Sequence, residues 1–512
     1  MAFISEIEGY ALLLFFGIAM LGITYFFAKR SRENGEIGFL AAGRKISWLL
    51  GAPSIAASWI WAPALFVSVQ IAYEMGIPGL FWFVAPNIAA LGIFIFLAPK
   101  IRSLLPEGFT LPEWIRYRLK DEKVHKIYLF PFFLYQLMAV TVQLFAGGNL
   151  VSLLTGIPLV VAMPLLAAIS LSYSLLSGLK ASITTDFVQM VAIFVGLIII
   201  IPWAISAAGG METVTMGLGG LAGNTNVFDP GVAFSFGIVT AIGLIAGSVS
   251  DQQYWQRSFA IKRKDLAKSF LVGAILFGIV PIALSTLGFI AVDPSLGITL
   301  PEGIDSSMIG IATVAKLLPP FALVIFVAML LAGLSSTLDS GLCAASSLYA
   351  IDWKGKSPKE KRVIARERAG VKLNTMDLEI KETFEKRTVL SARIAMIVLT
   401  LAGLLVAVAV INIPGFGLQQ LWWIFNTIAA SVLVPTILSL YWNRLSAKGV
   451  FWGVIASFVV GIPVFIYGNI LNDPVITVGA TLFIIGISTG FCFIFQRNTP
   501  WKISNGAIKF RG

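Results

Sequence analysis

Long apolar blocks separated by short polar connections run through most of this chain. Each block is about 20 residues long, the length that crosses the hydrocarbon core of a bilayer as a helix. Helices suit that environment because each one pairs its own backbone hydrogen-bonding groups, and the sequence lacks the short alternating segments of a membrane β-barrel. Only 12% of the 512 residues are charged, about half the share expected of a soluble protein. The sequence therefore predicts an all-α polytopic membrane protein.

The apolar blocks predict about thirteen transmembrane helices. Their expected ranges are 8–28, 48–73, 79–98, 127–153, 158–177, 184–207, 232–250, 267–291, 318–350, 388–411, 418–442, 449–469 and 474–496. The first block is not expected to be a signal peptide, because it is too long and lacks the basic start that such peptides need.

Basic residues predict the orientation of these spans. Connections after odd-numbered spans are rich in Lys and Arg and include Arg44, Lys100 and Arg257, whereas Lys316 is the single basic residue found after even-numbered spans. Basic connections stay on the cytoplasmic side, so we expect the N-terminus outside and the C-terminus inside a plasma membrane. The net charge of +11 is explained by this topology and by contact with anionic lipid, and nucleic-acid binding is not needed to account for it.

The Cys and His residues do not favour an enzyme. Cys343 and Cys492 both fall inside apolar blocks, where a lone cysteine usually serves as a packing residue. The single histidine, His125, stands among lysines, and we expect it in a solvated loop. Neither a transition-metal site nor a nucleophile–base pair can be placed, so no catalytic activity is predicted.

The second span is the first place where the apolar pattern breaks. Gly51, Pro53, Ser58 and Pro63 lie close together there. Proline removes a backbone donor and frees carbonyl groups, which at membrane depth need a buried or hydrated partner. A bound cation is one such partner, and a kink that improves packing is the alternative.

The ninth span carries a polar stripe. Gly333, Ser336, Thr337 and Ser340 follow the spacing of one helical face, with Asp339 on its flank. Hydroxyl and carboxylate oxygens suit an alkali cation. Close helix packing would explain the glycine and the serines, but it does not explain the aspartate.

Two further aspartates stand at the ends of apolar spans. Asp186 opens the sixth span, where it is either a functional group or a helix N-cap. Asp251 ends the seventh span after Gly243 and Gly247, so this segment is also expected to leave regular helix. Spans two and seven begin two blocks of five spans, a pattern typical of inverted repeats that place broken helices around a mid-membrane site.

Several motifs then point to a family. They are FLAAGR (39–44), TLPEW (110–114), SGLKASITTDFVQ (177–189), DQQYWQR (251–257) and AGLSSTLDS (332–340). With these motifs in order, the chain resembles the sodium/solute symporter family over residues 38–445. The DQQYWQR string and SWIWA (58–62) resemble its urea-permease branch.

This resemblance implies a LeuT-type fold with two inverted five-helix repeats. It divides the chain into residues 1–47 (first helix and cytoplasmic connection), 48–207 (first repeat), 208–442 (second repeat, with a cytoplasmic loop at 353–387) and 443–512 (two peripheral helices and a tail).

The resemblance also implies a site for a coupling Na⁺ ion between the second and ninth spans. Its expected ligands are the carbonyls of Ala57, Ile60 and Gly333 and the hydroxyls of Ser336 and Thr337. Some members have a second cation site, which here would involve Asp186, Ser336, Asp339 and Ser340. Asp339 stands where those members have a hydroxyl, so either Asp186 or Asp339 is expected to bind a second sodium ion or a proton.

The solute is expected beside the sodium site, in a pocket without a buried Arg or Lys. The candidate contacts are Trp59, Trp61, Asp251, Gln252, Tyr254, Asn426 and Thr427. Aromatic and amide side chains suit a small polar solute, with urea or a similar amide first and an amino acid such as proline second. A membrane sensor and a passive channel remain the alternatives to a symporter, and we expect a monomer surrounded by lipid.

Overall fold

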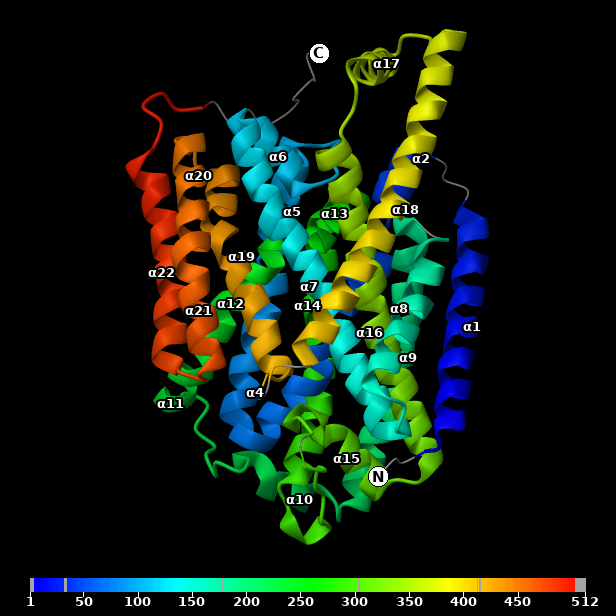
Figure 1. The fold of residues 1–512 in the computed structure, drawn as a ribbon, viewed down its shortest axis with the longest axis vertical. Helices are drawn as coiled ribbons and strands as arrows, with labels where there is room; N and C mark the ends of the chain where they lie inside the picture. The colour runs from blue at the N-terminus through cyan, green and yellow to red at the C-terminus, as the bar shows by residue number, and fades with distance from the viewer. Residues whose placement is uncertain are drawn as a thin grey trace.

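The computed structural model describes residues 4–31, 35–176, 178–302, 304–411, 413 and 416–501. Within these ranges the chain is helical, and its only β-type pairing is an isolated bridge between Ile46 and Ile261. Most of the long helices run along one axis of the molecule and form a single bundle (Figure 1). The predicted all-α membrane architecture is confirmed.

The helices of the first part are α1 (Glu6–Ser31), α2 (Gly35–Ala41), η1 (Ala42–Arg44), α3 (Trp48–Trp59), η2 (Pro63–Val67), α4 (Ser68–Gly92), α5 (Phe94–Leu104), α6 (Leu111–Leu119), α7 (Glu122–Thr155), α8 (Leu159–Ser174) and α9 (Leu179–Ala207). Those that follow are α10 (Met211–Met216), η3 (Gly217–Gly219), α11 (Pro230–Val232), η4 (Ala233–Gly237), α12 (Ile238–Ser250), α13 (Gln252–Ala260), η5 (Arg263–Asp265), α14 (Leu266–Ala291), η6 (Pro294–Leu296), η7 (Ser306–Met308), α15 (Ile309–Leu317) and α16 (Pro320–Ser347). The last are η8 (Leu348–Lys354), α17 (Pro358–Arg368), α18 (Thr375–Ile411), α19 (Leu418–Tyr441), α20 (Ala447–Ala456), η9 (Ser457–Gly461), α21 (Ile462–Ile470) and α22 (Pro474–Ile494).

Eleven helical segments of the described chain are long and apolar enough to cross a membrane. Two features account for the difference from the thirteen predicted spans. The segment Pro63–Leu104 turns at Gly76, where φ is 68°, and its 42 residues are long enough for two passes. Only glycine fits this turn, because a Cβ at Gly76 would lie 2.4 Å from the backbone of Gly219. The second feature is α8, a shorter apolar helix of 16 residues.

The second and seventh spans are both interrupted, as their sequences predict. Helix α3 ends at Trp59 and the helical path resumes at Pro63, with Ile60 between them at ψ 66°. Helix α12 ends at Ser250, and Asp251 has extended backbone angles and caps α13 by accepting a hydrogen bond from Gln253 N. Both interruptions are buried, so their free backbone groups need partners inside the protein.

Packing brings these broken spans to the middle of the bundle. Helix α3 contacts α9, α14 and α16, while α12 contacts α4 and α19. The helices after residue 443, α20 to α22, pack on one another and on α19 at one edge of the bundle, and α1 lies at the opposite edge (Figure 1). The predicted repeat boundaries at 48–207 and 208–442 stay a prediction.

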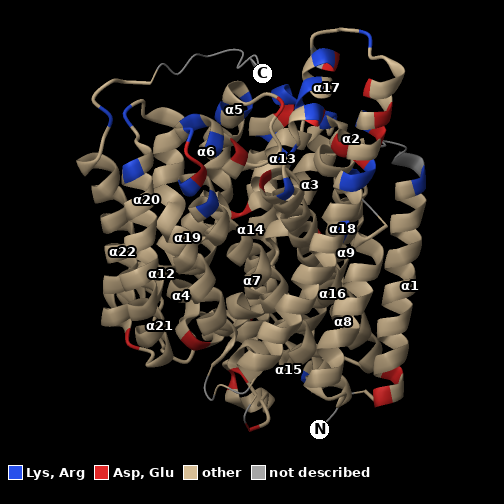
Figure 2. Cartoon of the chain, turned by 45° about the horizontal axis from the view of Figure 1, so that its top comes forward, with Lys and Arg blue, Asp and Glu red and all other residues tan. Residues whose placement is uncertain are grey.

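The surface has two distinct kinds of region. Large apolar side chains on the long helices point outward, including Ile198, Leu405 and Val459, which suits contact with lipid chains. Lys and Arg gather at the end of the bundle that carries α6 and α17, while the opposite end is nearly free of them (Figure 2).

The loop predicted at 353–387 is largely helical. It contains α17 and the start of α18, joined by several ion pairs. The prediction for His125 was wrong. Its ring is only 2% exposed, and Nε2 lies 2.9 Å from Asp352 Oδ1, because η8 continues α16 and packs against α7.

Candidate ion and solute site

The broken second span and the ninth span meet at Thr337. Its hydroxyl oxygen lies 3.1 Å from Ile60 O and 3.4 Å from both Ala57 O and Gly333 O. A hydroxyl donates only one hydrogen bond at a time, so lone pairs on the other carbonyl oxygens stay available to a bound ion. Each of these four residues is buried. The structure therefore brings together four of the five predicted sodium ligands.

Ser336, the fifth predicted ligand, is the neighbour of Thr337 on α16. Its hydroxyl donates a 2.5 Å hydrogen bond to Asp186 Oδ1, which leaves the serine oxygen with acceptor capacity. Three carbonyl and two hydroxyl oxygens form a donor set that suits a hard alkali cation. The residues present thus fit the ion that the sequence implies.

Asp186 does not cap a helix, because α9 begins at Leu179, seven residues before it. Its Oδ2 accepts hydrogen bonds from Ser54 Oγ at 2.6 Å and from Arg257 Nη2 at 2.8 Å. Arg257 also donates to Ser340 Oγ at 2.6 Å. The predicted second-cation residues Asp186 and Ser340 are therefore linked by a guanidinium group.

This arrangement corrects two sequence-based expectations. Arg257 was expected in a cytoplasmic connection, and no buried Arg was expected near the site, yet its side chain is fully buried. The reason is that α13 continues the broken seventh span beyond Asp251, which carries Arg257 into the protein. A buried guanidinium is tolerated only with a charged partner and satisfied donors, and Asp186, Ser54 and Ser340 provide them.

Asp339 lies apart from this ion pair. Its side chain is 1% exposed, and neither carboxylate oxygen has a hydrogen-bond partner among the described residues. The hydroxyls of Ser174 and Ser182 lie beside it, but neither completes a hydrogen bond to it. A buried carboxylate without partners is costly, so this group needs either a proton or a cation.

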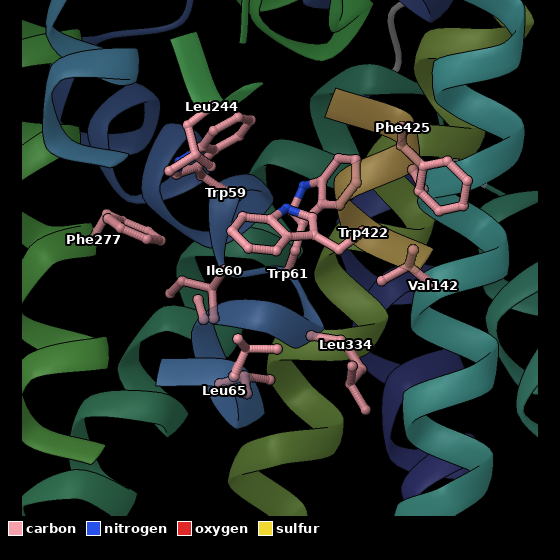
Figure 3. Packing of buried hydrophobic residues seen from close by; sticks show 14 of the residues in the cluster. Trp59, Ile60, Trp61, Leu65, Val142, Leu244, Phe277, Leu334, Trp422 and Phe425 are labelled. Carbon is pink, nitrogen blue, oxygen red and sulfur yellow. The ribbon is translucent and has the colours of Figure 1, made fainter. Parts of the chain in front are cut away.

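Aromatic rings form a second group next to the break in α3. The ring centroids of Trp59 and Trp61 are 6.1 Å apart, Trp59 lies 5.2 Å from Tyr254, and Trp61 lies 5.4 Å from Tyr135. Figure 3 shows the indoles of Trp59, Trp61 and Trp422 gathered beside Ile60.

The two predicted tryptophans line this space and have no free donor. Trp59 Nε1 donates to Asn87 Oδ1 at 2.8 Å, and Trp61 Nε1 donates to Ser58 O at 2.9 Å. A cavity of about 10 Å³ between the rings holds about one water molecule. The aromatic group is thus nearly closed.

Polar groups form a layer beside these rings. Asp251 Oδ1 accepts hydrogen bonds from Gln136 Nε2 at 3.0 Å and from Gln253 N at 2.9 Å. Tyr135 Oη donates to Asn426 Oδ1 at 3.2 Å. Glycine at 247 is required here, because a Cβ would lie 2.5 Å from Asn426 Oδ1 and 2.6 Å from Tyr135 Oη.

Much of the hydrogen-bonding capacity of this polar layer is unused within the described chain. The buried atoms that lack a partner are Asp251 Oδ2, Gln136 Oε1, the Gln253 amide, Asn426 Nδ2 and Thr427 Oγ1. Buried polar atoms in a native protein are normally satisfied, so this concentration is a signal of ligand binding. Of the predicted solute contacts, Asp251, Asn426 and Thr427 belong to this set, and the Oη of Tyr254, beside Trp59, also lacks a partner.

One predicted solute contact lies elsewhere. Gln252 Nε2 donates to Phe109 O at 2.9 Å, and its Oε1 accepts from Leu111 N at 3.3 Å. Gln252 therefore fastens α13 to the loop before α6. The residues that sequence reasoning missed are Asn87, Tyr135, Gln136, Gln253, Arg257 and Trp422. Polar residues within apolar spans, such as Gln136 in α7, were the available signal.

Comparisons with known proteins agree with this geometry. The model of the Sodium:solute symporter family matches residues 39–376. The urea-proton symporter DUR3 of Oryza sativa is 25% identical over 520 residues, covering 92% of this chain and 67% of that protein. A probable urea active transporter of Schizosaccharomyces pombe is 23% identical over 310 residues, covering 56% of this chain and 46% of that protein, so the chain spans less than half of that relative.

Solved structures show the same fold. A Na⁺-coupled sialic acid symporter in a substrate-bound outward-open state superposes with a TM-score of 0.73 at 17% identity, covering 97% of this chain and 99% of that one. The nucleobase-cation symporter Mhp1 in a closed conformation gives 0.50 at 14% identity, with 91% and 96% covered. The predicted LeuT-type fold is confirmed, the relatives are transporters and not enzymes, and the chain belongs to the sodium:solute symporter family.

Proposed function

We propose that this protein is a sodium-coupled symporter that carries urea or a similar small amide across the plasma membrane, with its N-terminus outside. The observation that carries the proposal is the convergence of Ala57, Ile60 and Gly333 carbonyls on the Thr337 hydroxyl, next to a polar layer with unused hydrogen-bonding atoms. The basic residues at the α6 and α17 end of the bundle support the orientation (Figure 2).

Sodium would couple to transport by holding α3 against α16. Two of its carbonyl ligands, Ala57 and Ile60, end α3, whereas Gly333, Ser336 and Thr337 belong to α16. An ion bound between these helices favours whichever conformation keeps them together, by its difference in affinity for the two states. Lower sodium and a negative potential inside then favour release, at about 2.3 kcal/mol per charge per 100 mV.

The chemistry of the polar layer favours a solute rich in N–H groups. Asp251 Oδ2 and Gln136 Oε1 are acceptors, while Asn426 Nδ2 is a donor and the Gln253 amide supplies one of each. Urea offers four N–H donors around one carbonyl acceptor, which matches this excess of acceptors. An amino acid would need a cation for its carboxylate, and the Arg257 guanidinium is already engaged by Asp186, Ser54 and Ser340.

The Arg257 guanidinium also bears on which ion occupies the second coupling site. Because Arg257 supplies the positive charge beside Asp186, a second sodium ion there would meet a like charge. Asp339 has no partner and is the remaining acidic group of the pair singled out by the sequence. We therefore assign a proton, not a second sodium ion, to Asp339.

The experiment is uptake of radiolabelled urea into proteoliposomes that contain the purified full chain. Imposed inward sodium gradients should drive accumulation above equilibrium, and replacing sodium with potassium should abolish it. Equilibration without accumulation would indicate a passive channel, and binding without uptake would indicate a sensor. A panel of proline, glucose, pantothenate and choline tests the solute, and accumulation of one of these without urea would overturn the assignment.

A further inference from the structure

A second, larger cavity lies away from the ion and solute site, at the basic end of the molecule. It measures about 770 Å³, a size typical of small-molecule sites. Its walls come from the loop between α5 and α6, from α6, from η8 with the residues after it, and from α17. Figure 1 shows α17 lying crosswise to the bundle, beside the end of α18.

One face of α17 is fixed to α18. Glu360 pairs with Arg387 at 2.9 Å, and Glu367 pairs with Lys381 at 2.5 Å. A capping box of Ser357 with Glu360 begins the helix. These contacts position α17 without using the face that covers the cavity.

The other face of α17 turns toward the cavity. Its cavity-lining residues include Pro358, Lys361, Arg362 and Ala365, which follow the i, i+3, i+4, i+7 spacing of one helical face. Neither Lys361 nor Arg362 forms an ion pair within the described part of the chain, and both side chains are exposed. Two free cations therefore stand over the cavity, where they would attract an anionic group.

The opposite wall carries acidic and aromatic groups, together with two cations that are already paired: Arg116 with Glu122 at 2.6 Å and Lys356 with Glu36 at 2.8 Å. Glu113 accepts a hydrogen bond from Phe109 N at 2.9 Å through Oε2, and Asp352 accepts from Thr110 Oγ1 at 2.7 Å. Tyr117 lines the same cavity. Burial and, to a smaller extent, the nearby Asp352 carboxylate raise the pKa of Glu113 to about 7, so this carboxyl can accept or donate near neutral pH.

We propose that this cavity binds a nucleoside phosphate. The phosphate groups would bond to Lys361 and Arg362, while the base would lie against Tyr117 with its N–H edge on Glu113. The unpaired cations lie on α17, and the apolar part of the lining, which includes Leu105 and Ile364, is interrupted on the other wall by Glu113 and Asp352. This favours a nucleotide over a phospholipid, because hydrocarbon chains that extend from a headgroup at the cations would lie against these two carboxyl groups. An aromatic base with polar edges suits that wall instead.

The cavity is connected to the broken seventh span. Thr110 bonds to Asp352, and the residues on either side of Thr110 are held by Gln252, the first residue of α13. A ligand that joins α17 to this loop would therefore stabilise the position of α13. Nucleotide binding does not depend on which solute is carried, so its test is separate from the transport assay.

The test is isothermal titration calorimetry of the full-length protein in an uncharged detergent with ATP, AMP, GTP and pyrophosphate. Saturable nucleotide binding that falls about tenfold or more in a Lys361→Gln/Arg362→Gln variant is expected. Lys359→Gln is the matched control, since it removes one positive charge from α17 at a position that does not line the cavity. Its affinity should stay within about twofold of the parent protein.

A third variant tests the position of the base. Glu113→Gln should weaken ATP binding and leave pyrophosphate binding unchanged, whereas equal effects on both probes would overturn the placement of the base. Absence of saturable binding by every nucleotide to monodisperse protein would overturn the proposal, as would an equal loss in the Lys359→Gln control. Thermal stabilisation by phosphatidylglycerol that is lost in the double variant, without nucleotide binding, would assign the cavity to lipid instead.

Discussion

Replacing Thr337 by alanine tests the sodium site most directly. The Thr337 hydroxyl is one of five expected ligand oxygens and lies 3.1 to 3.4 Å from three others. A hydrogen-bonding or ligand contact to a charged group is worth about 1.5 to 3 kcal/mol. Because each 1.4 kcal/mol is a factor of ten, the sodium concentration for half-maximal uptake should rise about tenfold to a hundredfold.

The assay is the initial rate of solute uptake against external sodium in proteoliposomes, with ionic strength held constant. At saturating sodium, Thr337→Ala should recover most of its transport rate, since the solute contacts are untouched. Thr337→Ser keeps the hydroxyl and should stay within about threefold of the parent protein. Ser346→Ala provides a structural control, because that hydroxyl lies on the same helix and donates to Cys343 O.

One result would refute the sodium site. If Thr337→Ala transports with the sodium dependence of the parent protein, the oxygen cluster between α3 and α16 is packing and not an ion site. If Thr337→Ala fails to fold while Thr337→Ser folds, the same assay is run on Thr337→Val, which keeps the side-chain volume without the hydroxyl.

Four other substitutions have distinct expected outcomes. Asp339→Asn should flatten the pH dependence of sodium-driven uptake while leaving its sodium dependence unchanged. Asp251→Asn should raise the solute KM about tenfold, measured at saturating sodium. Arg257→Ala should lower the yield of monodisperse protein, because stranding the buried Asp186 charge costs about 3 to 5 kcal/mol, and adding Asp186→Asn should restore part of that yield. Glu113→Gln should remove a pH dependence of thermal stability. The pKa of Glu113 is raised from 4.5 to about 7 in the folded protein, so between these values the folded protein keeps a proton that the unfolded chain releases. The stability of the parent protein therefore falls as pH rises across that interval. Melting curves between pH 4.5 and 8 measure this.

The fold was largely predictable because the bilayer fixes helix length. Apolar blocks marked the spans, and prolines with glycines marked the two that break. The oxygen cluster proposed to bind sodium was predictable for the same reason, since Gly333 and Thr337 stand one turn apart on α16 and face the end of α3. The spacing of these residues along a single helix was enough to predict that they share a face.

The polar layer was only partly predictable, because the direction of the side chains after a break in a helix does not follow from their direction before it. Asp251 leaves helical geometry, so the rotation of α13 relative to α12 cannot be extrapolated from the sequence. Adjacent residues on a helix point about 100° apart. Gln252 was therefore expected at the solute site, while in the structure it holds the loop before α6 and Gln253 joins the polar layer.

Arg257 shows why hydropathy alone can assign a buried charge to a connection between spans. An Arg after an apolar block is normally read as the cytoplasmic end of a span, yet here Arg257 joins its own helix α13 to α3 through Ser54. The same guanidinium reaches Asp186 of α9 and Ser340 of α16. Four helices, α3, α9, α13 and α16, therefore meet at one buried ion pair, and in the proposed transport cycle water would reach this pair only when these helices separate. In the proposed cycle, sodium at Thr337 would hold α3 to α16 about one turn of α16 away from Ser340, so losing the ion would remove one of two ties and leave the ion pair as the remaining barrier to opening.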